Sequence, residues 1–364
     1  MFARLSLSNL YHTVGAAPNR AELAPRQITV MKKVLLLLLL CLACGAAQAQ
    51  TQPKLLQADR IRLSEAFRLG ESVGDEVWKG WKKTPFAVLL ITPDYEFLIR
   101  HPKPSSDFTS IGYDSLLKSE VYYRKRVFQT TLLATFPAVG GVSTIVIGQA
   151  ENTDAKTSTP WVVTLFHEHF HQLQDSQPDF YPSVNALNLA RGDQTGMWML
   201  NFPFPYERTE VAEQFARLSR ALDDALSSIN TKQFDAKLAA YLSARKRFQE
   251  ILAPDDYRYY SFQLWKEGVA RYTEYRVALW AARHYRPTSE FRSLTDFKPF
   301  ADEARAIFER IHRQLSNPQL ATRQRDSFYA MGGAEALLLD RASPQWHKRY
   351  FIEKFQLERF FPTH

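Results

Sequence analysis

Cysteine is almost absent from this sequence of 364 residues, and the two that occur, Cys41 and Cys44, lie in one apolar segment near its start. The rest of the chain therefore has no cysteine for a disulfide or a zinc finger. It also has no glycine-rich loop for a phosphate and no basic block with interleaved aromatic residues. These absences argue against nucleotide and nucleic-acid partners. Stability must come from any bound metal and from the core, for which 45% hydrophobic residues are sufficient.

Residues 31–49 have the composition of a secretory signal peptide. Two lysines precede a run of leucines, and the segment ends in Ala-Gln-Ala, so cleavage is expected before Gln50. The apolar run is too short to be a stable membrane span. Because a signal peptide begins near its own methionine, residues 1–30 are interpreted as an upstream extension and Met31 as the initiator. Residues 1–49 are thus expected to be removed, which leaves a mature chain without a predicted membrane span.

The processed protein is expected to be exported, either to a periplasm or out of the cell. Leu42-Ala43-Cys44 resembles the end of a lipobox, but Cys41 stands where leucine is usual, so a lipid anchor is the weaker interpretation. Removal of residues 1–49 takes away five basic residues and one acidic residue, which lowers the formal net charge from +8 to +4. Such a balance is typical of an ordinary solvated surface.

The pattern of apolar residues changes at about residue 151. Residues 50–151 contain a helical start and three apolar, β-branched runs typical of strands, at 85–92, 95–101 and 143–149, the first two joined by a Pro-Asp turn. Residues 152–364 are mainly helical, with periodic runs at 207–228, 232–252, 261–285, 300–315 and 327–341. We therefore predict an α+β fold in which a small N-terminal mixed sheet packs on a larger helical region. No Gly/Ser linker separates them, so one compact unit is expected.

The strand candidate at 143–149 comes shortly before the most distinctive helix of the chain. It is either an edge strand, along which an extended substrate backbone would pair, or an internal strand of the sheet. The pattern of its residues leaves both interpretations open, because apolar runs occur in both kinds of strand.

That helix, predicted within Trp161–Asp175, contains the pattern His-Glu-x-x-His with His167, Glu168 and His171. At 3.6 residues per turn the two histidines lie one turn apart on one face, where two imidazoles can bind the same tetrahedral zinc ion. Glu168 lies a further step round the helix and faces the zinc-bound water. The pattern is a zinc-hydrolase signature.

The same helix is amphipathic. Its apolar stripe, which would pack on the core, consists of Val162, Phe166, Phe170 and Leu173. Thr159 is expected to cap the N-terminus, with Pro160 at the first helical position. His169 projects to the side nearly opposite His167 and His171, so we expect it to bond a neighbouring group rather than a metal.

A third zinc ligand is expected from the predicted helix at 261–285. Glu267 and Glu274 are seven residues apart, so both carboxylates face nearly the same way. Glu267 is the best candidate for direct binding, while the other carboxylate accepts the remaining ring N–H of a ligand histidine and fixes its tautomer. The alternative is a solvated glutamate pair on a charged helix face, with Arg271 beside it.

The segment Glu-Gly-x-Ala-x-Tyr-x-Glu-Tyr at 267–275, together with the His-Glu-x-x-His motif, resembles the gluzincin metallopeptidases, in particular their aminopeptidase N branch. The resemblance implies a zincin-like catalytic region, Zn2+ as cofactor, Glu267 as zinc ligand and Glu274 as its support. It also implies that the tyrosine of a Tyr-x-x-Gly segment stabilises the oxyanion, and Tyr329 begins such a segment. A phenol can donate a hydrogen bond to the charge that develops on a carbonyl oxygen. Alternatively, Tyr329 is a packed helical aromatic next to two glycines.

The chain departs from that branch in ways that concern the substrate. Ninety-five residues lie between His171 and Glu267, more than in the aminopeptidases. Lys266 stands where asparagine is usual, Met331 stands where lysine is usual, and no Gly-x-Met-Glu-Asn segment is present to bind a free amino terminus. We therefore expect endopeptidase or broad activity on peptides or proteins rather than strict aminopeptidase activity.

Together these features predict an exported zinc metallopeptidase in which His167, His171 and Glu267 bind the metal and Glu168 is the general base. The alternative is a non-enzymatic secreted module that keeps the metal-binding scaffold and binds a peptide or an envelope partner. The presence of Glu168 favours the enzyme, because a structural metal needs no base. The sequence leaves the oligomeric state open.

Overall fold

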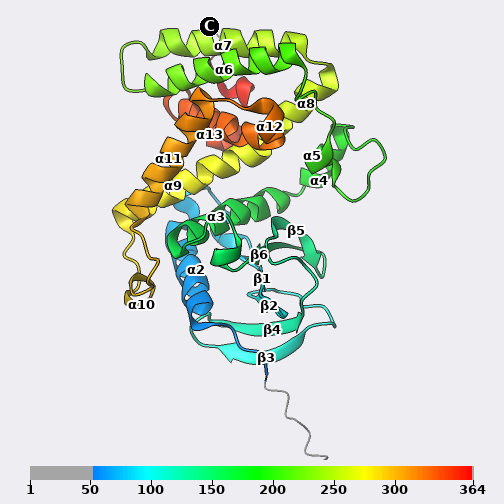
Figure 1. Cartoon of the computed structure of the whole chain (residues 1–364), viewed down its shortest axis with the longest axis vertical. Helices are drawn as coiled ribbons and strands as arrows, with labels where there is room; N and C mark the ends of the chain where they lie inside the picture. Colours follow the sequence, from blue (N-terminus) through cyan, green and yellow to red (C-terminus); the bar gives the residue numbers. More distant parts are fainter. Residues whose placement is uncertain (1–51, 363–364) are drawn as a thin grey trace, which may run out of the picture. The chain divides into compact units, whose positions relative to one another are not determined.

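The computed structural model describes residues 52–362, so the expected upstream extension and signal peptide lie outside the described residues. Residues Pro53–His364 form one compact unit. This unit contains a six-stranded mixed sheet and many helices, which confirms the predicted α+β class (Figure 1). No helix in the described part of the chain is long and apolar enough to span a membrane.

The sheet has the strand order β3-β4-β2-β1-β6-β5, and only β1 and β6 pair in parallel. β1 and β2 form the hairpin predicted around the Pro-Asp turn. The strands are β1 Val88–Ile91, β2 Tyr95–Ile99, β3 Thr109–Asp114, β4 Ser119–Lys125, β5 Leu133–Val139 and β6 Val142–Gly148.

The strand predicted at 143–149 corresponds to β6, which lies between β1 and β5. Its interpretation as an edge strand is therefore wrong, and the internal alternative is correct. The edge next to it is β5, which the sequence pattern does not predict. β5 consists mostly of exposed and half-buried residues and therefore lacks an apolar run. It also contains Pro137, and proline is tolerated in a sheet mainly on edge strands.

The helices agree with most of the predicted periodic runs. Those at 207–228, 232–252, 300–315 and 327–341 correspond to α6, α7, α11 and α13. The helices are α2 Gln57–Val77, α3 Ser158–Asp175, α4 Phe180–Ala186, α5 Trp198–Asn201, α6 Thr209–Ser227, α7 Phe234–Ile251, α8 Pro254–Gln263, α9 Val269–His284, α10 Ser289–Arg292, α11 Phe300–Ser316, α12 Leu320–Arg323, α13 Ser327–Ala342 and α14 His347–Tyr350.

The predicted helix at 261–285 is built from three pieces that continue one another. They are the end of α8, a π-helical segment η3 at Leu264–Gly268, and α9. A π-helical turn contains more residues than an α-helical turn, so it changes the direction in which the residues within it project. Glu267 lies inside this π-helical segment, so its side chain projects in a different direction than it would from a continuous α-helix.

The N-terminus of α3 also differs from the prediction. The helix begins at Ser158, and Thr157 occupies the capping position without a side-chain bond, so Thr159 is not the cap. The hydroxyl of Thr159 instead donates to the carbonyl oxygen of Lys298 at 2.6 Å. The backbone N–H and hydroxyl of Ser158 donate to Asp296 at 2.9 and 2.6 Å. A carboxylate from a distant segment thus takes over the role of a local cap.

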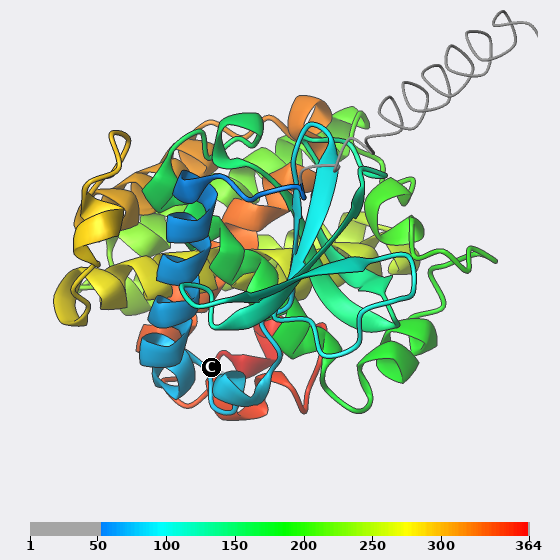
Figure 2. The ribbon, with the colours of Figure 1, turned by 90° about the horizontal axis from the view of Figure 1, so that it is seen from below.

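The sheet is buried on both faces. In β1, Val88 and Leu90 belong to the main core shared with the helices, whereas Leu89 and Ile91 belong to a smaller cluster on the other face. α3 packs on α2 and contacts β5 and β6. In Figure 2, α2 lies to the left of the sheet, and the buried hydrophobic residues of α2 belong to the main core.

The remaining long helices lie beyond α3 in successive layers (Figure 1). α9 packs on α3, α11 and α13 pack on α9, and α6 packs on both α11 and α13 while it pairs with α7. α3 is therefore held between the sheet and the helical layers, with one side facing each.

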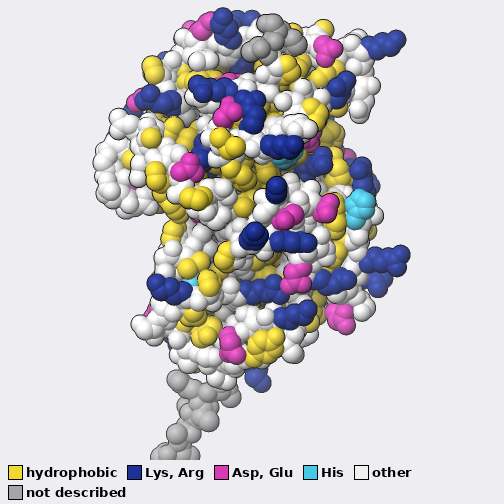
Figure 3. Space-filling model, turned by 180° about the vertical axis from the view of Figure 1, so that it is seen from behind, with side chains coloured by type: hydrophobic (Ala, Val, Ile, Leu, Met, Phe, Trp, Pro, Cys, Tyr) yellow, Lys and Arg dark blue, Asp and Glu magenta, His cyan; other side chains and the backbone are white. Residues whose placement is uncertain are grey.

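The surface carries both signs of charge. On the face shown in Figure 3, Lys and Arg side chains are interspersed with Asp and Glu side chains and do not gather in one block. This mixing agrees with the modest net charge of the chain after residue 49.

Candidate metal centre

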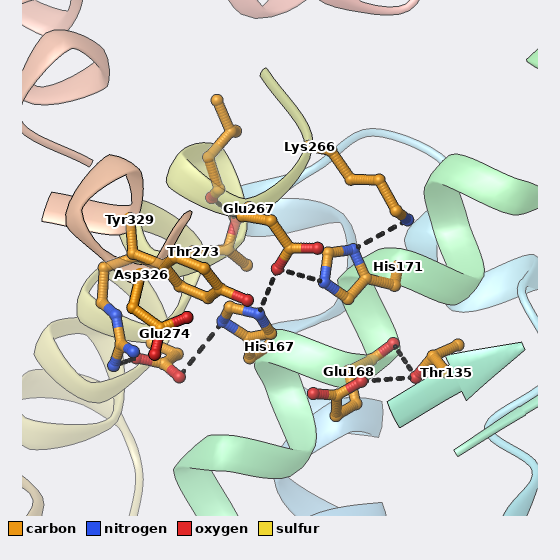
Figure 4. A network of polar contacts seen from close by, with 12 residues as sticks. Thr135, His167, Glu168, His171, Lys266, Glu267, Thr273, Glu274, Asp326 and Tyr329 are labelled. Carbon is orange, nitrogen blue, oxygen red and sulfur yellow. Dashed lines mark hydrogen bonds and ion pairs between the residues drawn. The ribbon is translucent and has the colours of Figure 1, made fainter. Parts of the chain in front are cut away.

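Helix α3 presents both histidines of the His-Glu-x-x-His motif to the helical layers. Its apolar stripe, formed by Val162, Phe166, Phe170 and Leu173, is buried in the core. His167 and His171 have ring centroids 4.8 Å apart and point toward η3 and α13 (Figure 4). The helical period thus separates packing residues from candidate ligands, as the sequence predicted.

Glu267 joins the two histidines in a group of three metal-binding side chains. Its Oε2 lies 3.4 Å from Nε2 of His167 and 3.3 Å from Nε2 of His171 (Figure 4). One ligand atom from each residue lies within 4.8 Å of the others, and all three residues are buried. Ligands bound to zinc at about 2.0–2.1 Å in a tetrahedron are about 3.3–3.4 Å apart. The two distances from Glu267 therefore suit ligands of one tetrahedral metal ion, which would have a fourth position for water or substrate.

Two glycines bring the helix of Glu267 against α13. A Cβ atom on Gly268 would lie 2.3 Å from Cα of Gly332, and one on Gly332 would lie 2.4 Å from the carbonyl oxygen of Leu264. The two backbones thus touch at a point where a larger residue does not fit. Gly268 directly follows Glu267, and Tyr329 lies one turn before Gly332. The close crossing therefore places Glu267 and Tyr329 side by side (Figure 4).

Each candidate ligand histidine has a side-chain oxygen close to its other ring nitrogen, although the contact of His167 with Glu274 does not meet hydrogen-bond geometry. Nδ1 of His167 lies 3.2 Å from Oε1 of Glu274, and Nδ1 of His171 lies 2.7 Å from Oε1 of Gln174. When Nδ1 is the donor, Nε2 keeps a lone pair for a metal. Glu274 thus lies at the supporting position predicted for it. Gln174 was missed, although its spacing of three residues from His171 was a usable signal.

The two glutamates are not solvated. Glu267 is 8% exposed and Glu274 is 4% exposed, so the alternative of a solvated pair is wrong, although Arg271 does pair with Glu274. Burial raises the pKa of Glu274, but Arg271 and His167 outweigh it and hold the pKa below its usual value. Burial also raises the pKa of Glu267, and His171 and His167 lower it well below the usual value. Burial lowers the pKa of His167, yet Glu267 and Glu274 raise it to about 9.

Glu168 is held in place by the sheet. The hydroxyl of Thr135, in the edge strand β5, donates to Oε2 of Glu168 at 2.7 Å and lies 3.2 Å from its backbone carbonyl oxygen (Figure 4). This bond fixes one carboxylate oxygen and leaves the other able to accept a proton from water. Thr135 was missed because the strand that carries it has no apolar pattern.

Tyr329 lies against the same group. Its ring is stacked on that of His167, with centroids 5.8 Å apart and an interplanar angle of 9°. Its hydroxyl accepts a hydrogen bond from Nη1 of Arg325 at 2.8 Å. Burial raises the pKa of Tyr329 well above its usual value and Glu267 raises it further, so the phenol keeps a proton to donate. Tyr329 is therefore packed, as the alternative required, and also close to the candidate ligands.

His169 lies on the opposite side of α3, as expected from helical geometry. Its ring stacks on Phe86 with centroids 3.9 Å apart and on Trp81 with centroids 5.2 Å apart. Its Nδ1 lies 2.8 Å from Oε1 of Gln172, and burial lowers its pKa to about 4. His169 is thus a neutral, packed side chain outside the metal-binding group.

Comparisons with known proteins give no further identification. The chain matches no protein-family model, no curated protein and no solved structure. The interpretation of the site therefore depends on its own residues and their geometry.

Proposed function

We propose that the exported chain is a zinc-dependent metallopeptidase of the gluzincin type, which hydrolyses peptide bonds. The proposal rests on the convergence of His167, His171 and Glu267 on one point, at separations suited to a tetrahedral metal ion. Two histidines and one glutamate are a ligand set of catalytic zinc, which keeps a fourth position open. Glu168 supports catalysis, because a site that only stabilises the fold needs no base.

The residues around the metal position divide the steps of hydrolysis between them. Bound zinc supplies a water of lowered pKa and polarises the substrate carbonyl. The free oxygen of Glu168 takes a proton as the water oxygen attacks the carbonyl carbon, while Thr135 holds its other oxygen. Glu168 then gives this proton to the leaving nitrogen as the C–N bond breaks. Tyr329 donates a hydrogen bond to the carbonyl oxygen while that oxygen carries negative charge.

The edge strand β5 is a suitable place for an extended peptide. It is next to α3 and contacts Glu168 through Thr135. A sheet edge has backbone N–H and C=O groups with which a peptide can pair. β5 thus replaces the strand at 143–149 as the candidate for substrate pairing. The missing Gly-x-Met-Glu-Asn segment still favours activity other than strict removal of N-terminal residues.

Metal analysis of the purified chain from Gln50 onward tests the metal assignment. We expect one zinc per chain. We expect the His167→Ala protein to lose this zinc, because only two of the three proposed protein ligands would remain. His284→Ala is the matched control, since His284 is exposed and lies at the end of α9, outside the metal-binding group. Stoichiometric zinc in the His167→Ala protein would show that the assignment is wrong.

Glu168→Gln distinguishes the enzyme from the non-enzymatic alternative. The substitution keeps the size of the side chain and an acceptor for Thr135, but it removes the base. Turnover should fall by about 10²–10⁴-fold while zinc is retained. The measurement is product formation from a broad peptide library, with both proteins at equal zinc content. If the wild-type protein and the Glu168→Gln protein were equally inactive, the alternative of a secreted binding module would be favoured.

A further inference from the structure

Two arginines close to the candidate metal centre, Arg271 and Arg325, differ in whether a carboxylate pairs directly with the guanidinium group. Arg271 is paired with the buried carboxylate of Glu274. Arg325 makes one hydrogen bond within the described residues, to the hydroxyl of Tyr329. Its Nη1 lies 3.7 Å from Oε1 of Glu267 and its Nη2 lies 3.8 Å from Asp326, both beyond hydrogen-bond distance. Most of the five N–H donors of Arg325 are therefore available to a ligand.

Arg325 is also accessible from outside. Its side chain is 21% exposed, whereas that of Arg245, a guanidinium that pairs with Glu335 and Glu358 in the core, is 4% exposed. The phenols of Tyr206 and Tyr259 are further electrostatic neighbours of Arg325. A half-buried guanidinium with free donors and neighbouring phenols has the composition of an anion-binding site. We call Arg325 and its phenol neighbours Tyr206, Tyr259 and Tyr329 the corner.

The backbone before Arg325 is strained. Gln324 has φ 47° and ψ −126°, a conformation that glycine adopts readily and other residues avoid. Such a conformation persists where the surrounding structure fixes it, often at ligand-binding sites. It marks the change from α12 to the short 3-10 helix η4, Gln324–Asp326, which carries Arg325 to Tyr329.

Metal binding would leave the charge of Arg325 unbalanced. In the described residues its nearest carboxylates are those of Glu267 and Asp326, and the side chain of Asp326 is 71% exposed. Solvent screens that exposed pair. Once Glu267 binds a divalent cation, its negative charge is shared with the metal, and the corner has an excess of positive charge.

We propose that Arg325 binds a substrate carboxylate beside the scissile bond, so that the chain prefers peptides whose C-terminal carboxylate belongs to the residue after that bond. The inference rests on the proposed function. One oxygen of Glu267 faces the metal position and the other lies 3.7 Å from Nη1 of Arg325, so a single carboxylate group spans the space between the metal position and the guanidinium. This spacing suits a ligand whose carboxylate belongs to the residue next to the carbonyl at the metal position. The planar fork of a guanidinium matches both oxygens of a carboxylate. An acidic side chain on the same residue would offer the same chemistry.

The test uses three peptides that differ only in the carboxylate. They are acetyl-Ala-Ala-Leu with a free C-terminus, the same peptide as a C-terminal amide, and the amide of acetyl-Ala-Ala-Glu. Binding is measured by calorimetry with the zinc-loaded Glu168→Gln protein, which leaves the peptides intact. We expect the free acid to bind about 10- to 100-fold more tightly than the leucine amide, as hydrogen bonds to charged groups predict.

Substitutions at Arg325 assign this preference to one side chain. Arg325→Gln should remove the preference for the free acid, and Arg325→Lys should keep only part of it, because lysine has charge without a fork. Neither substitution should lower the zinc content, because neither removes a proposed zinc ligand; Arg325 is only a cation near the carboxylate of Glu267. The matched control is Arg323→Gln, because Arg323 is an exposed arginine two residues away, in α12. It should leave the preference unchanged.

The outcomes separate this inference from the proposed function. Equal binding of the free acid and both amides, or a preference that survives Arg325→Gln, would overturn the role of Arg325 even if the wild-type protein cleaves peptides. Binding of the glutamate amide as tight as that of the free acid, lost in Arg325→Gln, would support carboxylate binding and identify a side chain as its source. Carboxylate binding that depends on Arg325, without cleavage of any peptide by the wild-type protein, would support the inference and refute the peptidase.

Discussion

Two clusters of ionisable side chains in this molecule are both largely buried but differ in geometry. In the candidate metal centre, formed by His167, His171 and Glu267, one carboxylate oxygen lies 3.3 and 3.4 Å from the two Nε2 atoms. In the second cluster, which we call the arginine cluster, Arg245 contacts Glu335 and Glu358 directly, at 2.6 and 3.1 Å, and Tyr241 and Tyr257 complete it.

Burial does not distinguish the two clusters. Glu335 is 0% exposed and Arg245 is 3% exposed, while Glu267 is 8% exposed, so all three have left water. The difference is that Arg245 supplies the arginine cluster with its own cation. In the candidate metal centre two Nε2 atoms and one carboxylate oxygen face each other, and the raised pKa of His167 keeps a proton there that a metal ion would replace. Convergence of donor atoms on one point, where a metal ion can take the place of a proton, is therefore the better sign of a metal site.

Breaking the arginine cluster should give the largest loss of stability. Arg245→Met leaves the buried Glu335 and the partly exposed Glu358 without their cation, which we expect to lower the free energy of unfolding by about 3–5 kcal/mol. Denaturant titration measures this loss, and metal analysis should still find one zinc per folded chain. The double substitution Arg245→Met/Glu335→Leu should recover part of the loss. Loss of zinc at unchanged stability would contradict the separation of the two clusters.

Substitutions in the candidate metal centre should lower zinc affinity or turnover and leave the fold intact. Glu274→Gln keeps the size of the side chain but removes the charge beside Nδ1 of His167, so zinc affinity or turnover should fall by about 10- to 100-fold while the fold survives. Glu267→Gln should lower zinc affinity further, because it removes an anion that faces the metal. Zinc competition with a chelator gives both values. Unchanged affinity and turnover in Glu274→Gln would refute its supporting role.

The smallest effect is expected at the contact between the sheet and the metal centre. Thr135→Val keeps the shape and the strand preference of the side chain but removes the hydroxyl that donates to Glu168. A lost hydrogen bond to a charged group costs about 1.5 kcal/mol, or roughly a tenfold decrease in kcat. Zinc content and unfolding free energy should stay near those of the wild-type protein. A turnover equal to that of the wild-type protein would show that Thr135 does not position the base.

Sequence reasoning succeeded where one helix sets the geometry. His167 and His171 share a face of α3, because a fixed period converts spacing into direction. Glu267 and Glu274 also both lie close to His167, although Glu267 lies in a π-helical segment that the spacing did not predict. Thr135 and Arg325 reach the same place from other segments, so no local period points to them. Their positions follow from sheet order and from the crossing of Gly268 with Gly332, which depend on tertiary packing.

The fold was predictable to a similar extent. β1, β2 and β6 are buried and have apolar runs, whereas β3 and β5 are partly exposed and their residues show no clear period. The separation of the strand-like runs before residue 151 from the helical runs after it was enough for the α+β class. It was not enough for the strand order, because an apolar run is equally compatible with the edge and the interior of a sheet.

The two helices that supply the ligands have a further consequence. A metal bound to both His171 and Glu267 would act as a crosslink across the 95 residues between them. For a permanent bond, closing a loop of about 100 residues removes about 4.7 kcal/mol of entropy from the unfolded chain. Both cysteines precede residue 50, so in a chain processed at the predicted site zinc would be the one crosslink, and a reversible one. The lifetime of the folded protein outside the cell would then depend on the free zinc concentration. In a zinc-poor medium, loss of the metal would both abolish the proposed activity and expose the chain to proteolysis.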